Sequence, residues 1–154
     1  MIDQIDKRLL EYLQENNQIS NQDLADKVAL SPSPCSRRVK QLEEEGYIKK
    51  QVALLNPEKL GLNLTILVLV SLDNHTPLIM KEFENTLKSL AEVVQCYLIT
   101  GQSADYLIKV IVPDLNYYQS FLLDKLTPIK GVASVQSSFV LRSIIDTTAL
   151  PLDL

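Results

Sequence analysis

The chain has 154 residues, of which 46% are hydrophobic and 22% are charged, and its formal net charge at pH 7 is −4. These proportions are typical of a folded protein and exclude a disordered chain. The longest apolar run, within residues 64–72, is too short for a membrane-spanning helix, which needs about 20 apolar residues. The acidic start of the chain lacks the basic and apolar parts of a signal peptide. We therefore expect a cytoplasmic protein with no membrane partner.

The residues that build metal sites and catalytic centres are scarce. Cys35 and Cys96 are the two cysteines and His75 is the single histidine, which argues against a Cys/His metal site. A reducing cytosol argues against a disulfide, so we expect both cysteines to serve packing. His75 is expected in a surface turn. Because no nucleophile–base pair and no phosphate-binding loop occurs, the sequence predicts neither an enzyme nor a cofactor.

The chain divides into two parts by pattern. Residues 1–60 show a helical pattern of apolar residues in three short pieces, and residues 61–154 alternate between strand and helix patterns. The hinge lies near Asn56-Pro57 and Leu60-Gly61, which are turn and breaker residues. We therefore expect a small all-helical domain with a linker strand, followed by a larger α+β domain.

Three helices are expected in the first part. The first covers residues 3–15, the second starts at Ser20, and the third starts after a turn at Ala29-Leu30. Their expected caps are Asp3, Ser20 and Ser31, whose side chains accept hydrogen bonds from free backbone N–H groups at helix starts. Pro32 suits the first position of the third helix, and Gly46 is placed to end it.

The second part predicts a βαββαβ order, the ferredoxin-like arrangement. The expected elements are strand 64–72, helix 77–90, strands 93–100 and 105–112, helix 115–126 and strand 132–141. Such a sheet has helices on one face only. In strands 64–72 and 105–112, however, the residues expected to point to either face of the sheet are largely apolar. We expect a second copy to bury the uncovered face, which gives a homodimer or a higher oligomer built from dimers.

The third helix has the chemistry of a helix that reads the major groove of DNA. With Cys35, Val39 and Leu42 facing inward, Ser33, Arg37 and Lys40 point outward and Ser36 and Arg38 lie on the flanks. Arginine pairs with guanine and serine bonds bases or phosphates, while Arg38 and Lys40 suit phosphates. The alternative is that these residues form an ordinary solvated helix face.

Several segments of the chain resemble the leucine-responsive regulatory protein (Lrp/AsnC) family. In the first half they are residues 19–25 (ISNQDLA), 30–35 (LSPSPC), 38–39, 42–48 (LEEEGYI), 54–57 (LLNP) and 60–61. In the second half they are residues 94–97 (VQCY), 100–101, 105–107 (DYL), 131–132 and 137–138. The order and spacing of the SPxPC and TG…DY segments are highly specific, and the resemblance covers nearly the whole chain.

The resemblance implies an amino-acid-responsive regulator of transcription, often of amino-acid metabolism genes. It implies a winged-type helix-turn-helix joined by a strand to a βαββαβ amino-acid-sensing domain, and dimers that commonly assemble into octamers. The partners it implies are operator DNA and an amino acid bound between dimers. By this resemblance the residues that face DNA are Ser33, Pro34, Ser36, Arg37, Arg38 and Lys40.

The resemblance also implies an effector site. Its residues here are Thr100, Gly101, Gln102, Ser103, Ala104 and Asp105, with Ser137 supplying a hydroxyl to the ligand of a neighbouring subunit. Free N–H groups of a glycine turn hold a carboxylate, and Asp105 takes the ammonium group. The loop is one residue longer than is frequent in the family, and Val135 stands where a hydroxyl residue is common. The alternative is that Gly101 only forms a hairpin turn and Asp105 only caps it.

These features leave two functions open. The first is a regulator whose assembly and DNA binding respond to a small amino acid. A leucine- or methionine-like effector is favoured, because a pocket lined by Leu, Val and Ile would suit such a side chain. The second is an effector-independent oligomer that organises DNA architecture, an alternative that the unusual loop keeps open. A ligand-dependent change in assembly separates the two.

Overall fold

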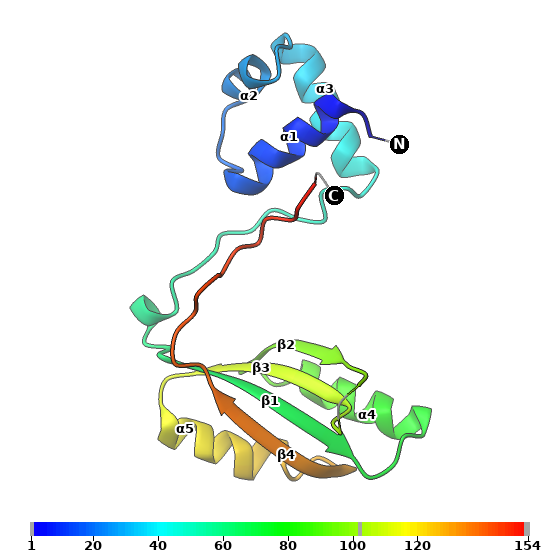
Figure 1. Cartoon of the computed structure of the whole chain (residues 1–154), viewed down its shortest axis with the longest axis vertical. Helices are drawn as coiled ribbons and strands as arrows, with labels where there is room; N and C mark the ends of the chain where they lie inside the picture. The colour runs from blue at the N-terminus through cyan, green and yellow to red at the C-terminus, as the bar shows by residue number, and fades with distance from the viewer. Residues whose placement is uncertain (1, 102, 153–154) are drawn as a thin grey trace. The chain divides into compact units, whose positions relative to one another are not determined.

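The computed structural model describes residues 2–101 and 103–152 and divides into two compact units. The helical unit combines Met1–Leu54 with Ile144–Leu154, and the sheet unit is Leu55–Ser143 (Figure 1). The C-terminal segment is tied to the first helix because Gln14 Nε2 donates to the Leu150 carbonyl (2.9 Å) and Gln14 Oε1 accepts from the Leu150 N–H (2.8 Å). The sequence pattern did not predict this return of the chain to its first helix.

The helical unit contains the three expected helices, α1 (Gln4–Glu15), α2 (Asn21–Lys27) and α3 (Pro32–Glu44). Asp3 caps α1 reciprocally: its carboxylate accepts from the Asp6 N–H at 2.8 Å, and the Asp6 carboxylate accepts from the Asp3 N–H at 3.1 Å. The two bonds satisfy two backbone donors that have no partner inside the helix. The position at which α1 begins is therefore determined by the local pair Asp3 and Asp6.

The caps of α2 and α3 differ. The Ser20 hydroxyl accepts from the Asp23 N–H at 3.0 Å, as expected. Ser31 stands at the N-cap of α3, but its hydroxyl makes no capping hydrogen bond, so the predicted side-chain cap is wrong. Pro32 follows Ser31 and has no N–H, which leaves one donor fewer to satisfy at this helix start.

The core of the helical unit is the apolar stripe that the sequence predicted. Its buried residues are Leu9, Leu24, Ala25, Val28, Cys35 and Leu42, with Val39 and Ile48 packed against them. Ala29, in the turn between α2 and α3, has φ 57°, and Gly46, after α3, has φ 79°. The Tyr47 N–H then donates to the Leu42 carbonyl at 2.9 Å, which closes the end of α3 as expected for a left-handed glycine.

The segment after α3 differs from the expected linker strand. Residues 49–56 form no strand, and a single 3₁₀ turn (Glu58–Leu60) precedes the sheet. An extended segment becomes a strand only when a neighbouring strand pairs with it. Within the described residues of one chain, nothing pairs with residues 49–56, so the linker is extended without being part of a sheet.

The sheet unit has the predicted βαββαβ order. Its elements are β1 (Leu64–Leu72), α4 (Pro77–Lys88), β2 (Val93–Leu98), β3 (Tyr106–Val112), α5 (Leu115–Ser120) and β4 (Val132–Phe139). The strands lie in the order β2-β3-β1-β4, and every neighbouring pair is antiparallel. Thr76 caps α4 by accepting from the Ile79 N–H. The chain continues from α5 into a π-helical turn (Phe121–Leu126), where a regular helix was expected.

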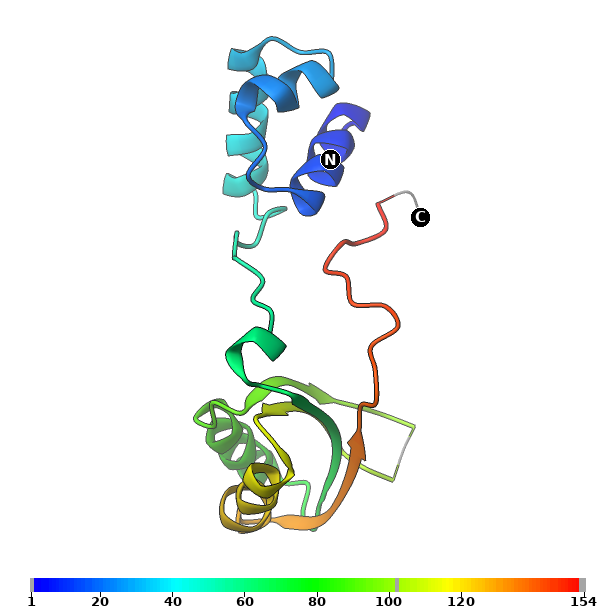
Figure 2. The ribbon, with the colours of Figure 1, turned by 90° about the vertical axis from the view of Figure 1, so that its left-hand side faces the viewer.

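Both helices cover the same face of the sheet (Figures 1 and 2). Alternate residues of β1 and β3 form the core beneath them, together with Phe83, Tyr118 and Phe121. The opposite face carries Leu67, Leu69, Leu107 and Ile111, as the pairing of Leu69 with Leu107 and of Thr65 with Ile111 requires. Leu67 keeps 38% of its surface exposed. The middle of the uncovered face is therefore apolar, as the sequence indicated, whereas Lys109 on β3 and Ser134, Gln136 and Ser138 on β4 add polar side chains around it.

Candidate nucleic-acid interface and ligand loop

The outward face of α3 carries polar side chains that are open to solvent. Ser33, Ser36, Arg37 and Lys40 are exposed, and Pro34 is half-buried. Arg37 makes no ion pair or hydrogen bond within the part of the chain that the structure describes. The Lys40 ammonium lies 3.6 Å from the Glu44 carboxylate, and both side chains are largely exposed, so this pair contributes little. Arg37 therefore presents its full set of donors to a partner.

Arg38 behaves differently from Arg37. Its Nη1 donates to Asp3 Oδ2 and to Asp6 Oδ1, both at 2.8 Å. The hydrogen bonds to Asp6 and Asp3 raise the pKa of Arg38. The pKa of Asp3 is lowered, chiefly by the Asp6 N–H and further by Arg38. Arg38 thus ties α3 to the start of α1, a contact for which the sequence gave no periodic signal.

Two further hydrogen bonds fix α2 between its neighbours. Asn21 Nδ2 donates to the Pro32 carbonyl at 2.8 Å, which joins the start of α2 to the start of α3. Arg8 Nη2 donates to the Lys27 carbonyl at 2.6 Å, which joins α1 to the end of α2. Hydrogen bonds from charged donors are among the stronger ones. The three helices that carry the outward face of α3 are therefore joined by side-chain hydrogen bonds as well as by their apolar core.

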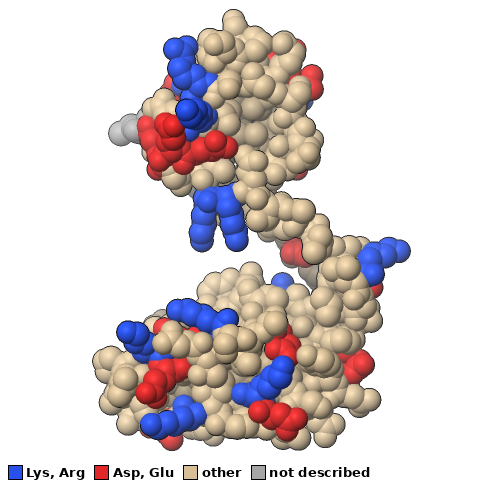
Figure 3. All heavy atoms as spheres, turned by 180° about the vertical axis from the view of Figure 1, so that it is seen from behind, with Lys and Arg blue, Asp and Glu red and all other residues tan. Residues whose placement is uncertain are grey.

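The helical unit carries charges of both signs on the face seen in Figure 3, where basic and acidic side chains lie next to one another. Glu43, Glu44 and Glu45 close the C-terminal end of α3, whereas Arg37 and Lys40 stand nearer its start. This distribution suits a protein that contacts DNA at one end of a helix rather than one that coats DNA through a broad basic surface.

The predicted effector loop connects β2 to β3. Its base is closed by a hydrogen bond from the Ile99 N–H to the Asp105 carbonyl (2.9 Å), and the Asp105 N–H donates to the Val70 carbonyl (2.9 Å). Gly101 has φ 83°, which a glycine adopts without strain. Thr100 and Ser103 are exposed and Ala104 is buried. Gln102, which was also predicted for this site, lies outside the described residues.

The Asp105 carboxylate is already engaged within the chain. Oδ2 accepts from the Leu72 N–H at 2.7 Å, and Oδ1 lies 2.8 Å from His75 Nε2. Asp105 therefore joins the effector loop to the end of β1 and to the turn before α4. His75 is exposed, as the sequence predicted, but it is not an isolated turn residue. Sequence reasoning missed this contact because the two residues are 30 positions apart and follow no shared pattern.

Ser137 lies apart from the loop within one chain. It stands opposite Val68 on the edge strand β4, and its hydroxyl is hydrogen-bonded to the Tyr118 hydroxyl at 2.5 Å. The sheet order places β1 and β3 between β4 and β2. A single chain thus brings Thr100, Gly101, Ser103, Ala104 and Asp105 together but not Ser137.

Other chemistries have little support in the described residues. Residues 2–101 and 103–152 contain no group of three or more His, Cys, Asp or Glu side chains placed to hold a metal ion. Both cysteines are free, Cys35 buried and Cys96 exposed. Across the same residues, no helix is long and apolar enough to cross a membrane.

Comparison with known protein families identifies both units. Residues 2–49 match the winged helix-turn-helix DNA-binding model, and residues 65–150 match the Lrp/AsnC ligand binding domain. The first match contains α1, α2 and α3, and the second contains the whole sheet apart from the first residue of β1. The polar face of α3 therefore lies in a DNA-binding module, and residues 100–105 lie in a ligand-binding module.

Individual relatives agree over nearly the full length. The chain is 41% identical to the Bkd operon transcriptional regulator of Pseudomonas aeruginosa over 151 residues, 98% of each protein. It is 36% identical to the leucine-responsive regulatory protein of Escherichia coli K12, covering 93% of this chain and 87% of that one. A solved structure of a transcriptional regulator from Neisseria meningitidis in complex with L-Met superposes with a TM-score of 0.95 at 40% identity, over 99% of this chain and 98% of that one. This chain belongs to the Lrp/AsnC family of DNA-binding transcriptional regulators.

Proposed function

We propose that this protein binds operator DNA through α3 and changes its assembly and DNA affinity when a small amino acid binds its sheet unit. The observation that carries the DNA-binding part is the outward face of α3, where Ser33, Ser36, Arg37 and Lys40 are exposed. Arginine forms paired hydrogen bonds with guanine, and serine and lysine suit bases and phosphates. Such a protein acts in the cytoplasm.

The roles on α3 divide between two adjacent arginines. We assign base recognition to Arg37, because its guanidinium is exposed. We assign to Arg38 the task of holding α3 against α1, because Asp3 and Asp6 both accept from its Nη1. This assignment refines the set expected from the sequence, in which Arg38 contacted phosphates.

We assign a leucine- or methionine-like effector to the loop at residues 100–105. Relatives support this class, since one is a leucine-responsive regulator and another was solved with L-Met. The N–H groups around Gly101 suit the carboxylate of an amino acid, and Asp105 suits its ammonium group. A ligand ammonium at Asp105 joins a network that already includes His75 and the Leu72 N–H, so effector binding reaches the end of β1.

Assembly completes the proposed mechanism. The apolar face carrying Leu67, Leu69, Leu107 and Ile111 supports a dimer in which two sheets cover each other. We propose four such dimers in an octamer, in which Ser137 of one subunit approaches the effector of its neighbour. The effector then shifts the balance between assemblies through its difference in affinity for them.

A second function follows from Asp105. Both of its carboxylate oxygens are engaged within the chain, so Asp105 has hydrogen-bond partners without a ligand. This observation favours an oligomer that organises DNA without an effector, as the alternative to the amino-acid-responsive regulator.

The two functions are separated by a thermal-shift screen of the purified protein against the twenty amino acids. A ligand that binds only the folded protein raises its melting temperature, by an amount set by its concentration relative to Kd. A rise with leucine or methionine, together with a change in oligomer mass by light scattering, supports the regulator. An unchanged melting temperature and mass with all twenty, with operator binding retained, favours the effector-independent oligomer.

A further inference from the structure

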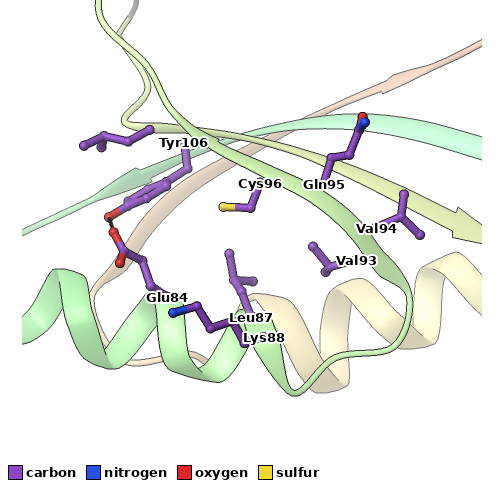
Figure 4. Close-up of a pocket in the computed structure, with 9 residues that line it drawn as sticks. Glu84, Leu87, Lys88, Val93, Val94, Gln95, Cys96 and Tyr106 are labelled. Atoms are coloured by element: carbon purple, nitrogen blue, oxygen red, sulfur yellow. Dashed lines mark hydrogen bonds between the residues drawn. The ribbon is translucent and has the colours of Figure 1, made fainter. Parts of the chain in front are cut away.

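A cavity outside the effector loop lies between α4 and the edge strand β2. It has a volume of about 310 Å³, which is near the lower end of the range for small-molecule sites, roughly 300–1,000 Å³. Its walls include Glu84, Leu87 and Lys88 of α4 and Cys96, Leu98 and Tyr106 of the sheet (Figure 4). None of the described loop residues, 99–101 and 103–105, lines it, so this cavity is separate from the described part of the proposed effector site.

The cavity carries one group of each charge. Glu84 and Lys88 are one helical turn apart on α4, which places their Cβ atoms about 6 Å from each other. Both line the cavity, yet no ion pair joins them in the described part of the chain. An α-amino acid carries an ammonium and a carboxylate on one carbon, so it matches a carboxylate and an ammonium that stand apart.

Glu84 is held in place before any ligand arrives. The Tyr106 hydroxyl donates to Glu84 Oε1 at 2.9 Å, and Tyr106 itself is only 1% exposed. Burial and the hydrogen bond to Glu84 both raise the pKa of Tyr106, which keeps its hydroxyl protonated as a donor. Among the described contacts, Glu84 Oε2 has no partner. A fixed carboxylate with one free oxygen is preorganised for an ammonium group.

Apart from Gln95, the rest of the lining is apolar. Leu87 is buried, and Val93 and the more exposed Leu98 also line the cavity. Figure 4 shows Cys96 reaching from β2 toward α4, over Leu87. Apolar walls beside two opposite charges favour an amino acid with an aliphatic or thioether side chain over a polar one.

From these observations we propose that the cavity between α4 and β2 is a second amino-acid site, in which Glu84 takes the ammonium, Lys88 the carboxylate, and Leu87, Val93 and Leu98 the apolar side chain. The site goes beyond the proposed effector loop and is formed within a single chain.

Cys96 is a built-in reporter of occupancy. The chain has two cysteines, and Cys35 is fully buried, so alkylation by iodoacetamide in the folded protein reports on Cys96. Burial, and then the nearby Glu84, raise the pKa of the Cys96 thiol. Because the thiolate is the reacting form, the reaction is run at mildly alkaline pH and followed by intact-protein mass.

The test measures how L-leucine and L-methionine slow the alkylation of Cys96 in the full-length protein. A ligand that fills the cavity is expected to slow alkylation about tenfold at ten times its Kd. 4-Methylpentanoic acid, which lacks the ammonium group, and isopentylamine, which lacks the carboxylate, are expected to protect at least about tenfold more weakly at equal concentration, as the loss of one charge-assisted hydrogen bond implies.

Variants decide where the protection originates. Glu84→Gln keeps an acceptor for the Tyr106 hydroxyl but loses the charge, and Lys88→Met loses the opposite charge. Both are expected to abolish protection. Lys81→Met, on α4 but outside the cavity lining, and Asp105→Asn, in the effector loop, are expected to retain it. Protection that survives Glu84→Gln and Lys88→Met but disappears in Asp105→Asn would overturn the second site.

One more outcome separates the two sites. If amino acids raise the melting temperature but leave the alkylation rate of Cys96 unchanged, the second site is wrong and the effector loop stands. If Cys96 is protected while Asp105→Asn leaves the rise in melting temperature unchanged, the cavity is the amino-acid site and the effector loop is not.

Discussion

The two predicted binding surfaces differ in how far the chain already uses their polar groups. On α3, Arg37 is exposed and has no partner in the described residues, while Arg38 beside it is bound to Asp3 and Asp6. In the loop between β2 and β3, Asp105 is bound to the Leu72 N–H and to His75. A partner of α3 meets a free guanidinium, whereas a ligand of the loop meets a carboxylate that also holds the fold together. Substitutions on the two surfaces should therefore have different consequences.

The largest effect is expected from Arg37→Ala. Loss of a paired contact to guanine costs about 1–3 kcal/mol, so operator affinity should fall roughly 5- to 150-fold. The melting temperature should change little, because Arg37 makes no hydrogen bond or ion pair in the part of the chain that the structure describes. Fluorescence anisotropy with labelled operator DNA measures the affinity. Equal operator affinity for the variant and the parent would show that α3 does not read bases through Arg37.

The next effect concerns Asp105, where binding and stability are coupled. Asp105→Asn keeps an acceptor for the Leu72 N–H but loses the charge, so amino-acid affinity should fall about tenfold or more, as the loss of a charged hydrogen bond implies. Its stability should change little. Asp105→Ala should in addition lose about 1–2 kcal/mol, because the Leu72 N–H is left without a partner. Calorimetric titration and urea unfolding measure the two quantities. Unchanged affinity in Asp105→Asn would remove Asp105 from the effector site.

A smaller effect is expected at an internal ion pair of the sheet unit. Glu92 is 8% exposed, and its carboxylate accepts from the Lys125 ammonium and from the Tyr117 hydroxyl. Lys125→Met should lower the free energy of unfolding by about 1–2 kcal/mol, below the range for fully buried pairs because Lys125 is partly exposed. DNA and amino-acid binding should be unchanged. A weaker amino-acid affinity in this variant would show that the pair also supports a ligand site.

The same pair predicts a dependence on pH. Burial raises the pKa of Glu92, but the hydrogen bonds from Lys125, from the Glu92 backbone N–H and from Tyr117, together with the charge of Lys125, outweigh it and hold the pKa below its ordinary value. A lowered carboxyl pKa contributes stability that is fully present above the unfolded-state pKa and is lost as the pH falls through the folded-state pKa. Unfolding measured from pH 6 down to about pH 3 should therefore show a smaller acid loss in Lys125→Met than in the parent.

The smallest effect is expected from Arg38→Met, which tests whether Arg38 supports the fold while Arg37 binds DNA. Its pairs are partly exposed, so stability should fall by about 1 kcal/mol or less. Any loss of operator affinity should be smaller than for Arg37→Ala and accompanied by this loss of stability. Arg38→Lys, which retains the charge, is the matched control. An operator affinity that falls as far as in Arg37→Ala, with stability unchanged, would instead assign Arg38 to DNA.

Most of the fold was predictable because its signals are local. The apolar stripes, the caps at Asp3 and Ser20, and the glycine at position 46 predicted the three helices, and alternation predicted the strands. The prediction failed at the Ser31 cap and in the linker. A side-chain cap requires a backbone N–H within reach of the serine hydroxyl, and a strand requires a second strand that pairs with it, and residue type reveals neither. The π-helical turn at Phe121–Leu126 likewise has no sequence signal that distinguishes it from a regular helix.

The sites were predictable as residue types but not as contacts. The outward position of Arg37 follows from helical periodicity alone. The engagement of Arg38 by Asp3 and Asp6 joins residues more than 30 positions apart, and that of Asp105 by His75 spans 30. The cavity between α4 and β2 was not predicted either, because the space left between two elements depends on how their side chains pack in three dimensions. Periodicity places a residue on a face but does not say what it touches there.

The bond between Gln14 and Leu150 bears on the order in which the protein is made. Ribosomal synthesis proceeds from the N-terminus, and domains generally fold as units while the chain emerges. The helical unit is discontinuous, since residues 144–154 belong to it and the whole sheet unit is inserted between its two parts. The backbone partner of Gln14, Leu150, is therefore synthesised 136 residues later. The helical, DNA-binding unit can therefore form its hydrogen bonds between Gln14 and Leu150 only after the ligand-binding unit has been synthesised. A chain truncated before residue 144 lacks this part of the helical unit.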